Sequence, residues 1–138
     1  MTVMNGSCHC GAVTFTVKLS DGIATARRCD CSLCARRGAV AVSAAKEDIT
    51  YTAGQDNLTR YQFNTKVAAH YFCKTCGIYT HHNRRSNTAE IGVTLACLEG
   101  QTPFLSEVIV NDGQNHPKDV GRDGIVGVLR FERMEGVE

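Results

Sequence analysis

The sequence predicts a mainly antiparallel β fold in short strands, tied together by bound metal. Apolar and polar residues alternate over short segments, which is the period of a half-buried strand. Turn residues such as Asp21 and Gly22 separate these segments. No segment shows a helical stripe beyond one turn, after Cys34 or near Lys46. Short strands leave many open sheet edges, and metal clasps are one way to hold such edges together.

The strands are expected to follow one another at short intervals. The first is Ala12–Lys18. Its Val13, Phe15 and Val17 side chains share one face. The others are expected at Gly38–Ser43, Ile49–Thr52, Leu58–Phe63, Ala68–Phe72, Ile78–His81, Ala89–Leu95, Glu107–Val110 and Ile125–Phe131. The turn at Gly54–Asn57 predicts that the strands on either side of it form a hairpin.

Length and charge limit the possible functions. The chain has 138 residues, enough for one domain with its own core, and residues 1–138 are interpreted as a single zinc domain. A formal charge of +1 argues against a nucleic-acid-binding protein, which usually carries a strongly basic stripe. No apolar run approaches the roughly 18 residues that span a bilayer. Met1–Ser7 has no signal-peptide character, so we expect a reducing, cytoplasmic location.

Seven of the eight cysteines fall into three closely spaced groups. The groups are Cys8 with Cys10, Cys29 with Cys31 and Cys34, and Cys73 with Cys76. Disulfides are not expected, because a reducing compartment keeps thiols reduced and a two-residue spacing strains a disulfide. Zinc instead accepts thiolates about 2.3 Å away at the corners of a tetrahedron. The spacing therefore predicts metal sites, and it favours zinc over iron.

The simplest partition of these groups makes one closed site and one open site. The two pairs together supply four thiolates, which is the ligand set of a structural zinc site. The loop Cys29–Cys34 supplies three and leaves a fourth position free, as in catalytic zinc sites. The sequence therefore predicts two zinc ions per chain, one structural and one catalytic.

Cys97 and three histidines are alternative candidates for the fourth position. Cys97 lies in an apolar run and is expected to be a buried core thiol rather than a ligand. His81 and His82 follow the Cys73 and Cys76 pair, and for both a satisfied or solvent-facing role is favoured over ligation. His9 lies between two ligands, so in an extended chain its side chain points away from the metal.

The open site suits sulfur chemistry. Zinc with three thiolates carries a net charge near −1, which weakens it as a Lewis acid for water and suits a soft sulfur ligand. A substrate thiol bound there would be favoured as the nucleophilic thiolate. The pairs Arg27/Arg28 and Arg36/Arg37 flank the loop, either as solvated surface charge or as a rim that binds carboxylates. A small acidic thiol fits both features.

The cysteine motifs also carry a resemblance to a known family. They read Gly-Ser-Cys-His-Cys-Gly at 6–11, Cys-Asp-Cys-Ser-Leu-Cys at 29–34 and Phe-Cys-Lys-Thr-Cys-Gly at 72–77, with Cys-Leu-Glu-Gly at 97–100 and Asp-Gly-Gln-Asn-His-Pro at 112–117. In this order, over residues 4–131, they resemble the glutathione-dependent formaldehyde-activating enzyme family, which shares a domain with a centromere protein. Many relatives carry a tryptophan in the C-terminal part, and this chain has none. The walls of the substrate pocket are therefore expected to differ.

The resemblance implies a fold, two metal sites and a reaction. The fold would be several small, coiled antiparallel sheets akin to methionine-R-sulfoxide reductase. A structural zinc would bind Cys8, Cys10, Cys73 and Cys76, and a catalytic zinc would bind Cys29, Cys31 and Cys34. The reaction would be that of a carbon–sulfur lyase, which forms or breaks down S-hydroxymethylglutathione or a related thiol adduct.

In this interpretation the substrate thiolate occupies the open position and attacks, or leaves, an aldehyde carbon. His116 or Asp112, both in the expected long loop Asn111–Asp123, would move the proton. Both residues can also be explained by ordinary turn chemistry, and for Asp112 this explanation is favoured. The alternative is a non-catalytic zinc module that binds glutathione or a protein partner, with both metals structural.

Overall fold

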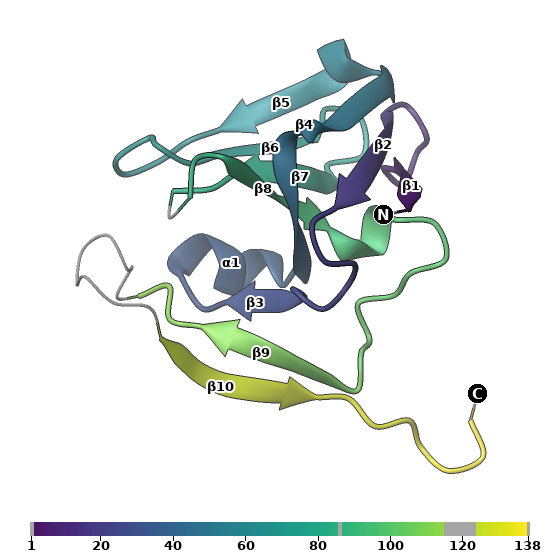
Figure 1. The fold of residues 1–138 in the computed structure, drawn as a ribbon, viewed down its shortest axis with the longest axis vertical. Helices are drawn as coiled ribbons and strands as arrows, with labels where there is room; N and C mark the ends of the chain where they lie inside the picture. Colours follow the sequence, from purple (N-terminus) through teal and green to yellow (C-terminus); the bar gives the residue numbers. More distant parts are fainter. Residues whose placement is uncertain (1, 86, 115–123, 138) are drawn as a thin grey trace.

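A computed structural model describes residues 2–85, 87–114 and 124–137. Its elements in chain order are β1 (Val3–Ser7), β2 (Thr14–Leu19), β3 (Arg27–Cys29), α1 (Ser32–Arg37), β4 (Ala41–Ala53), η1 (Gln55–Asn57), β5 (Leu58–Tyr61), β6 (Ala69–Cys73), β7 (Tyr79–Asn83), β8 (Glu90–Thr94), η2 (Leu95–Cys97), β9 (Glu107–Asn111) and β10 (Ile125–Arg130). The mainly β fold class is therefore confirmed (Figure 1).

Within the described ranges, the strands form one continuous hydrogen-bonded network. Eight of them follow the order β10-β9-β3-β4-β8-β7-β6-β5, and β1 and β2 attach through β4. All the pairs are antiparallel except one, in which β3 runs parallel to β9. The β3–β9 pair places Cys29 opposite Asn111, at the same end of the two strands. The triple-cysteine loop and the segment after β9 therefore begin side by side.

The long strand β4 joins two parts of the network. Its first residues, Ala41–Ala45, pair with β8, and its later residues, Ala44–Ala53, pair with β2. Two register shifts in the β2 pairing mark bulges, which bend a strand and increase its twist. Figure 1 shows β4 crossing the molecule between the upper strands and β3. The sequence pattern predicted two separate strands here and a helical turn near Lys46, but Lys46 is part of β4.

The predicted hairpin around Gly54–Asn57 is wrong. The strand before this turn, within β4, pairs with β2 and β8, whereas β5 after the turn pairs with β6. Gly54 explains the geometry, because its φ is 76° and a Cβ there would lie 1.9 Å from the Ala12 carbonyl oxygen. The chain turns closely against the segment around Ala12. As a result, β5 leads away from β4 instead of pairing with it.

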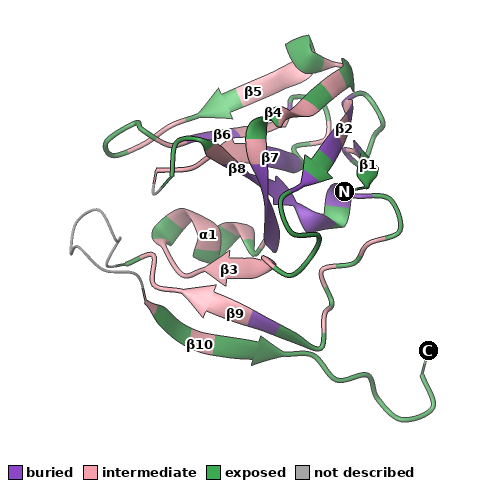
Figure 2. Cartoon of the chain, viewed as in Figure 1, coloured by how far each residue is buried: buried purple, intermediate pink, exposed green. Residues whose placement is uncertain are grey.

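The core lies where β2, β4 and β8 face one another. The predicted inward residues of β2 and its preceding turn, Val13, Phe15 and Val17, are all buried. Phe15 and Val17 pack with apolar residues of the neighbouring strands, such as Val42 and Val93, whereas Val13 packs in a second cluster with Cys8 and Cys73. Figure 2 shows the burial concentrated in the upper strands, whereas β10 at the opposite edge is mainly exposed. The apolar alternation therefore located the buried face correctly.

No helix among the described residues is both long enough and apolar enough to cross a membrane.

His81 is a buried histidine of β7 whose neutral form stabilises the fold. Its Nδ1 lies 2.5 Å from the Tyr51 hydroxyl, and its ring stacks on Tyr71 with centroids 4.7 Å apart. Burial lowers the pKa of His81 from 6.5 to about 4. Between these values the unfolded chain binds a proton that the folded chain does not, so stability is complete above pH 6.5 and decreases as the pH falls towards 4.

We therefore expect the free energy of unfolding of His81→Gln to decrease less than that of the wild type as the pH falls from 6.5 to 4. One proton gives a slope of at most about 1.4 kcal/mol per pH unit, and the variant should lose this component between pH 6.5 and 4. Chemical unfolding at several pH values measures it, with zinc content checked at each pH. The exposed His9 provides the control, because His9→Gln makes the same substitution at a histidine that is not buried. Equal slopes for the wild type and His81→Gln would contradict the assignment.

Candidate metal centres and active site

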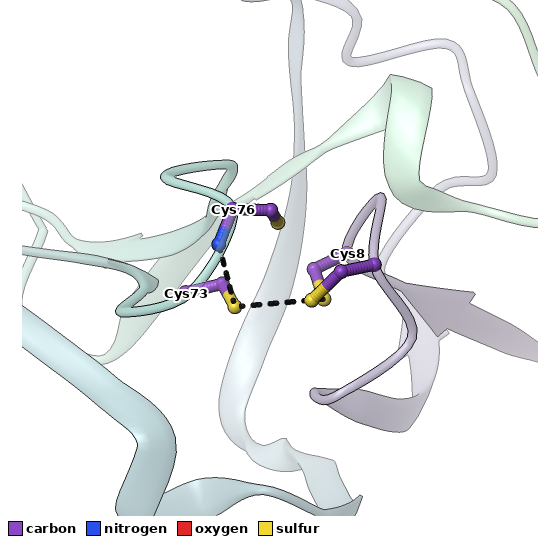
Figure 3. Close-up of side chains that lie close together, drawn as sticks. Cys8, Cys73 and Cys76 are labelled. Atoms are coloured by element: carbon purple, nitrogen blue, oxygen red, sulfur yellow. Dashed lines mark hydrogen bonds between the residues drawn. The ribbon is translucent and has the colours of Figure 1, made fainter.

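The first cysteine cluster brings together the two pairs that the sequence assigned to one site. The sulfur atoms of Cys8, Cys10, Cys73 and Cys76 all lie within 4.8 Å of one another. Sγ–Sγ distances of 3.6 Å (Cys8 to Cys10) and 3.7 Å (Cys10 to Cys73) match the about 3.8 Å expected between thiolates around a tetrahedral zinc ion. Figure 3 shows Cys8 approaching from one segment and Cys73 and Cys76 from the other. This donor set fits a four-thiolate zinc site.

Tight turns position both halves of this cluster. Cys73 ends β6, and the Gly77 N–H donates to the Cys73 carbonyl (2.8 Å) with Gly77 at φ 78°, a conformation that favours glycine. The sulfur of Cys73 accepts from the Cys76 N–H (3.5 Å) and the Asn57 amide (3.5 Å). The sulfur of Cys8 accepts from the Val13 N–H (3.4 Å). These donors stabilise thiolates, as metal binding requires.

The second cluster lies between β3 and α1. The sulfurs of Cys29, Cys31 and Cys34 lie within 4.8 Å of one another, and no fourth Cys, His, Asp or Glu of the described residues joins them. The Cys31 N–H donates to the sulfur of Cys29 (3.4 Å). The sulfur of Cys31 caps α1 by accepting from the Cys34 N–H (3.3 Å). Three convergent thiol groups with backbone donors fit a zinc ion with an open position.

The pKa values of the three thiols are shifted in different directions, because the thiols hydrogen-bond to one another. Hydrogen bonds from the Cys29 and Cys34 thiols lower the pKa of Cys31 to about 2. Hydrogen bonding to Cys31 and Cys34 raises the pKa of Cys29. A dication bound between the three sulfurs would favour deprotonation of all three.

The segment after β9 closes tightly over this cluster. The Gly113 N–H donates to the Asp30 carboxylate (2.7 Å), and the Asp30 N–H donates to the Asn111 carbonyl (3.3 Å). A Cβ on Gly113 would lie only 2.1 Å from the sulfur of Cys29. Glycine is therefore required here, because the backbone of residue 113 lies too close to the sulfur of Cys29 for a Cβ to fit. The sequence pattern treated Gly113 only as a turn residue, and no local signal shows that it touches the cysteine loop.

A cavity of about 470 Å³ opens beside the second cluster. All three cysteines line it, together with five arginines: Arg27, Arg28, Arg37, Arg84 and Arg85. Aromatic and histidine side chains, Phe63, His70, Tyr79 and His82, form another part of the wall. The cavity is therefore large enough for a small molecule, electropositive, and in contact with the open thiol cluster.

The structure brings three of the four predicted arginines to this cavity. Arg27 is largely withdrawn from water, which lowers its pKa to about 10, and its guanidinium donates to the Thr25 carbonyl (3.1 Å) and the Ser43 hydroxyl (3.0 Å). Arg28 and Arg37 also line the cavity. Arg36 is exposed, lies outside the lining, and donates to the Ser32 carbonyl (2.8 Å).

Sequence reasoning missed Arg84 and Arg85, which reach the cavity from the end of β7. Arg84 also donates to Ser43 (3.3 Å) and forms an ion pair with Glu90 (2.9 Å). Their distance in sequence from the cysteine loop hid them. The only signal in the sequence was their position directly after the predicted strand that follows the Cys73 and Cys76 pair.

The remaining candidates have separate positions. Cys97 is buried in the core, and its thiol donates to the Tyr79 carbonyl (3.4 Å), as expected for a core thiol. His82 hydrogen-bonds the Tyr79 hydroxyl through Nδ1 and lines the cavity, whereas His9 is exposed. Asp112 lines the cavity too. His116 lies outside the described residues.

Comparison with known proteins agrees with this geometry. The sequence model of the family described as "Glutathione-dependent formaldehyde-activating enzyme" matches residues 3–110. A crystal structure of a Rhodobacter sphaeroides protein is similar to this chain, with 59% sequence identity and a TM-score of 0.71. The match covers 72% of this chain and 92% of that one.

We expect Cys76→Ala to abolish folding. Structural zinc contributes about 10–16 kcal/mol in small finger peptides, which is comparable to the whole net stability of a domain. The variant should be insoluble or melt without a cooperative transition. Cys97→Ala is the matched control, because it removes a buried thiol that is not a ligand and should cost only about 1–2 kcal/mol. Wild-type melting of Cys76→Ala would rule out the four-thiolate site.

We expect Gly113→Ala to damage the second cluster alone. The added methyl group would collide with the sulfur of Cys29, so bound zinc should fall from two ions per chain towards one, while the fold persists. Gly127→Ala in β10 is the control, since nothing lies within 4 Å of its Cβ position. Elemental analysis and circular dichroism measure both quantities. Two tightly bound zinc ions in Gly113→Ala would contradict this account of the loop.

Proposed function

Because the chain belongs to the glutathione-dependent formaldehyde-activating enzyme family, we propose that it catalyses reversible addition of glutathione, or a related small acidic thiol, to an aldehyde. In the reverse direction the enzyme is a carbon–sulfur lyase acting on the adduct. The proposed site is the cavity beside Cys29, Cys31 and Cys34. One zinc ion there would be catalytic, and the second, at Cys8, Cys10, Cys73 and Cys76, structural.

One observation carries this proposal: the three-thiol cluster borders an arginine-lined cavity, whereas the four-thiol cluster is complete within the protein. A purely structural metal has no need of an electropositive cavity beside it. A zinc ion held by Cys29, Cys31 and Cys34 would supply a soft cationic centre that favours the thiolate form of a substrate sulfur.

The side chains of the cavity then bind and orient the substrate. Arginine pairs well with carboxylates, and glutathione has two of them. Arg28, Arg84 and Arg85 line the cavity and make its wall electropositive. The aromatic wall of Phe63 and Tyr79 limits water around the reacting carbon, which strengthens electrostatic interactions in the site.

The chemistry balances without an oxidant or a reductant. The S–H bond breaks, the sulfur forms a bond to the aldehyde carbon, and the carbonyl oxygen takes up a proton to become a hydroxyl. Asp112, on the cavity wall, and His116 are the proposed carriers of that proton. Both metal sites need reduced thiols, so we propose a cytoplasmic location.

We expect Cys34→Ser to fold normally, lose one of two zinc ions, and lose glutathione binding measured by calorimetry. Ser32→Ala, an exposed change in the same loop, should keep both properties. Unfolding of Cys34→Ser would instead make both metals structural and favour a non-catalytic binding module. Unchanged glutathione binding after loss of the zinc would place the thiol elsewhere.

A further inference from the structure

Arg37, at the end of α1, is held by three different groups at once. Its NH2 nitrogen donates to the sulfur of Cys34 (3.6 Å), and its NH1 nitrogen lies 3.1 Å from Nδ1 of His70. The guanidinium carbon lies 3.6 Å from the centroid of the Tyr79 ring, within the range of a cation–π contact. The side chain thus connects a cysteine of the open cluster to strands β6 and β7.

The hydrogen bond to His70 defines the state of that histidine. A guanidinium group has only donors, so Nδ1 of His70 must accept and its proton must be on Nε2. His70 is therefore a neutral acceptor for Arg37. The environment agrees, because burial together with the charge of Arg37 lowers the pKa of His70 to about 4.

Stacking keeps His70 in place. Its ring lies between those of Phe63 and His82, with centroids 5.9 Å and 5.2 Å away. His82 in turn rests on Gly92, where a Cβ would lie 2.2 Å from the imidazole ring. A stack of rings from three parts of the chain, with the buried His70 in the middle, thus fixes the nitrogen that receives Arg37.

The neighbouring arginine shows that this arrangement is specific to one position. Arg36 is exposed and donates to the Ser32 carbonyl of its own helix. Arg36 and Arg37 are chemically identical and adjacent, but only Arg37 contacts a cysteine of the cluster. The general effect of a cation near the C-terminal end of α1 is common to both, so a comparison of the two removes that effect and leaves the contacts of Arg37 with Cys34, His70 and Tyr79.

We propose that Arg37 is a positioning residue of the three-cysteine centre, which it serves by donating a hydrogen bond to the Cys34 sulfur while His70 and Tyr79 hold it in place. The inference rests on the proposed metal site but not on the identity of the substrate. The hydrogen bond withdraws electron density from the Cys34 thiolate, so a metal held there remains a better acceptor for a fourth ligand. Arg37 is then committed to the protein's own sulfur rather than to a substrate carboxylate.

The experiment uses cobalt(II) as the probe in the second site of protein that carries one equivalent of zinc. The charge-transfer band of that site is assigned as the band that is absent from the spectrum of cobalt-loaded Cys34→Ser. Arg37→Met should move it to lower energy, because the sulfur loses a cationic donor, and should weaken cobalt binding about tenfold or more in chelator competition. Arg36→Met should leave both properties at wild-type values. Wild-type band energy and affinity in Arg37→Met would overturn the proposal.

A second pair of variants tests the support from His70 and applies even if Arg37→Met fails to fold. His70→Asn keeps an acceptor at the position of Nδ1 and should retain the wild-type band. His70→Phe keeps the stacking but has no acceptor, so it should show the shift expected of Arg37→Met. Identical bands in both would overturn the role of His70. Glutathione titration of the same samples is independent: shifted bands without any glutathione binding would retain this proposal and refute the proposed function.

Discussion

Repulsion between thiolates is the constraint on which this structure depends. Four thiolates whose sulfur atoms lie within 4.8 Å of one another repel, and a cation between them would offset that repulsion. A zinc ion there would hold the N-terminal turn and the β6–β7 turn together. The apolar group around them is small: Cys8, Val13 and Cys73 are buried, and Tyr51, Leu58 and Cys76 pack against them. With this end fixed, β2 lies along β4 and the main core closes.

The parallel pairing of β3 and β9 gives the second centre its surroundings. It starts the cysteine loop and the segment Asn111–Gln114 from the same end of neighbouring strands, where Asp30 ties them together. This segment lies beyond residues 3–110, where the family match ends. The wall over the cluster is therefore built by residues that follow the range matched by the family model.

The sequence could predict what depends on local spacing. Cysteines two or three residues apart must present their sulfurs together, so both clusters were recognisable, and alternation located the buried face of β2. Pairing partners were less accessible, because a turn signal says where a strand ends and not which strand it joins next. Arg84 and Gly113 lie at the site because strands that are far apart in the sequence pair with one another. Arg36 and Arg37 cannot be distinguished in the sequence. The direction of α1 decides which of the two contacts the rest of the site.

Helix α1 has six residues and buries none of them. A helix this short is marginal in water by itself, and its ends depend on the Cys31 cap and the contacts of Arg37. Emptying the open centre would therefore allow α1 to unwind while the sheet and its first metal stay intact, as a local opening with a low free energy. Loss of zinc from the open centre alone would then lower the fraction of competent molecules without lowering the amount of folded protein.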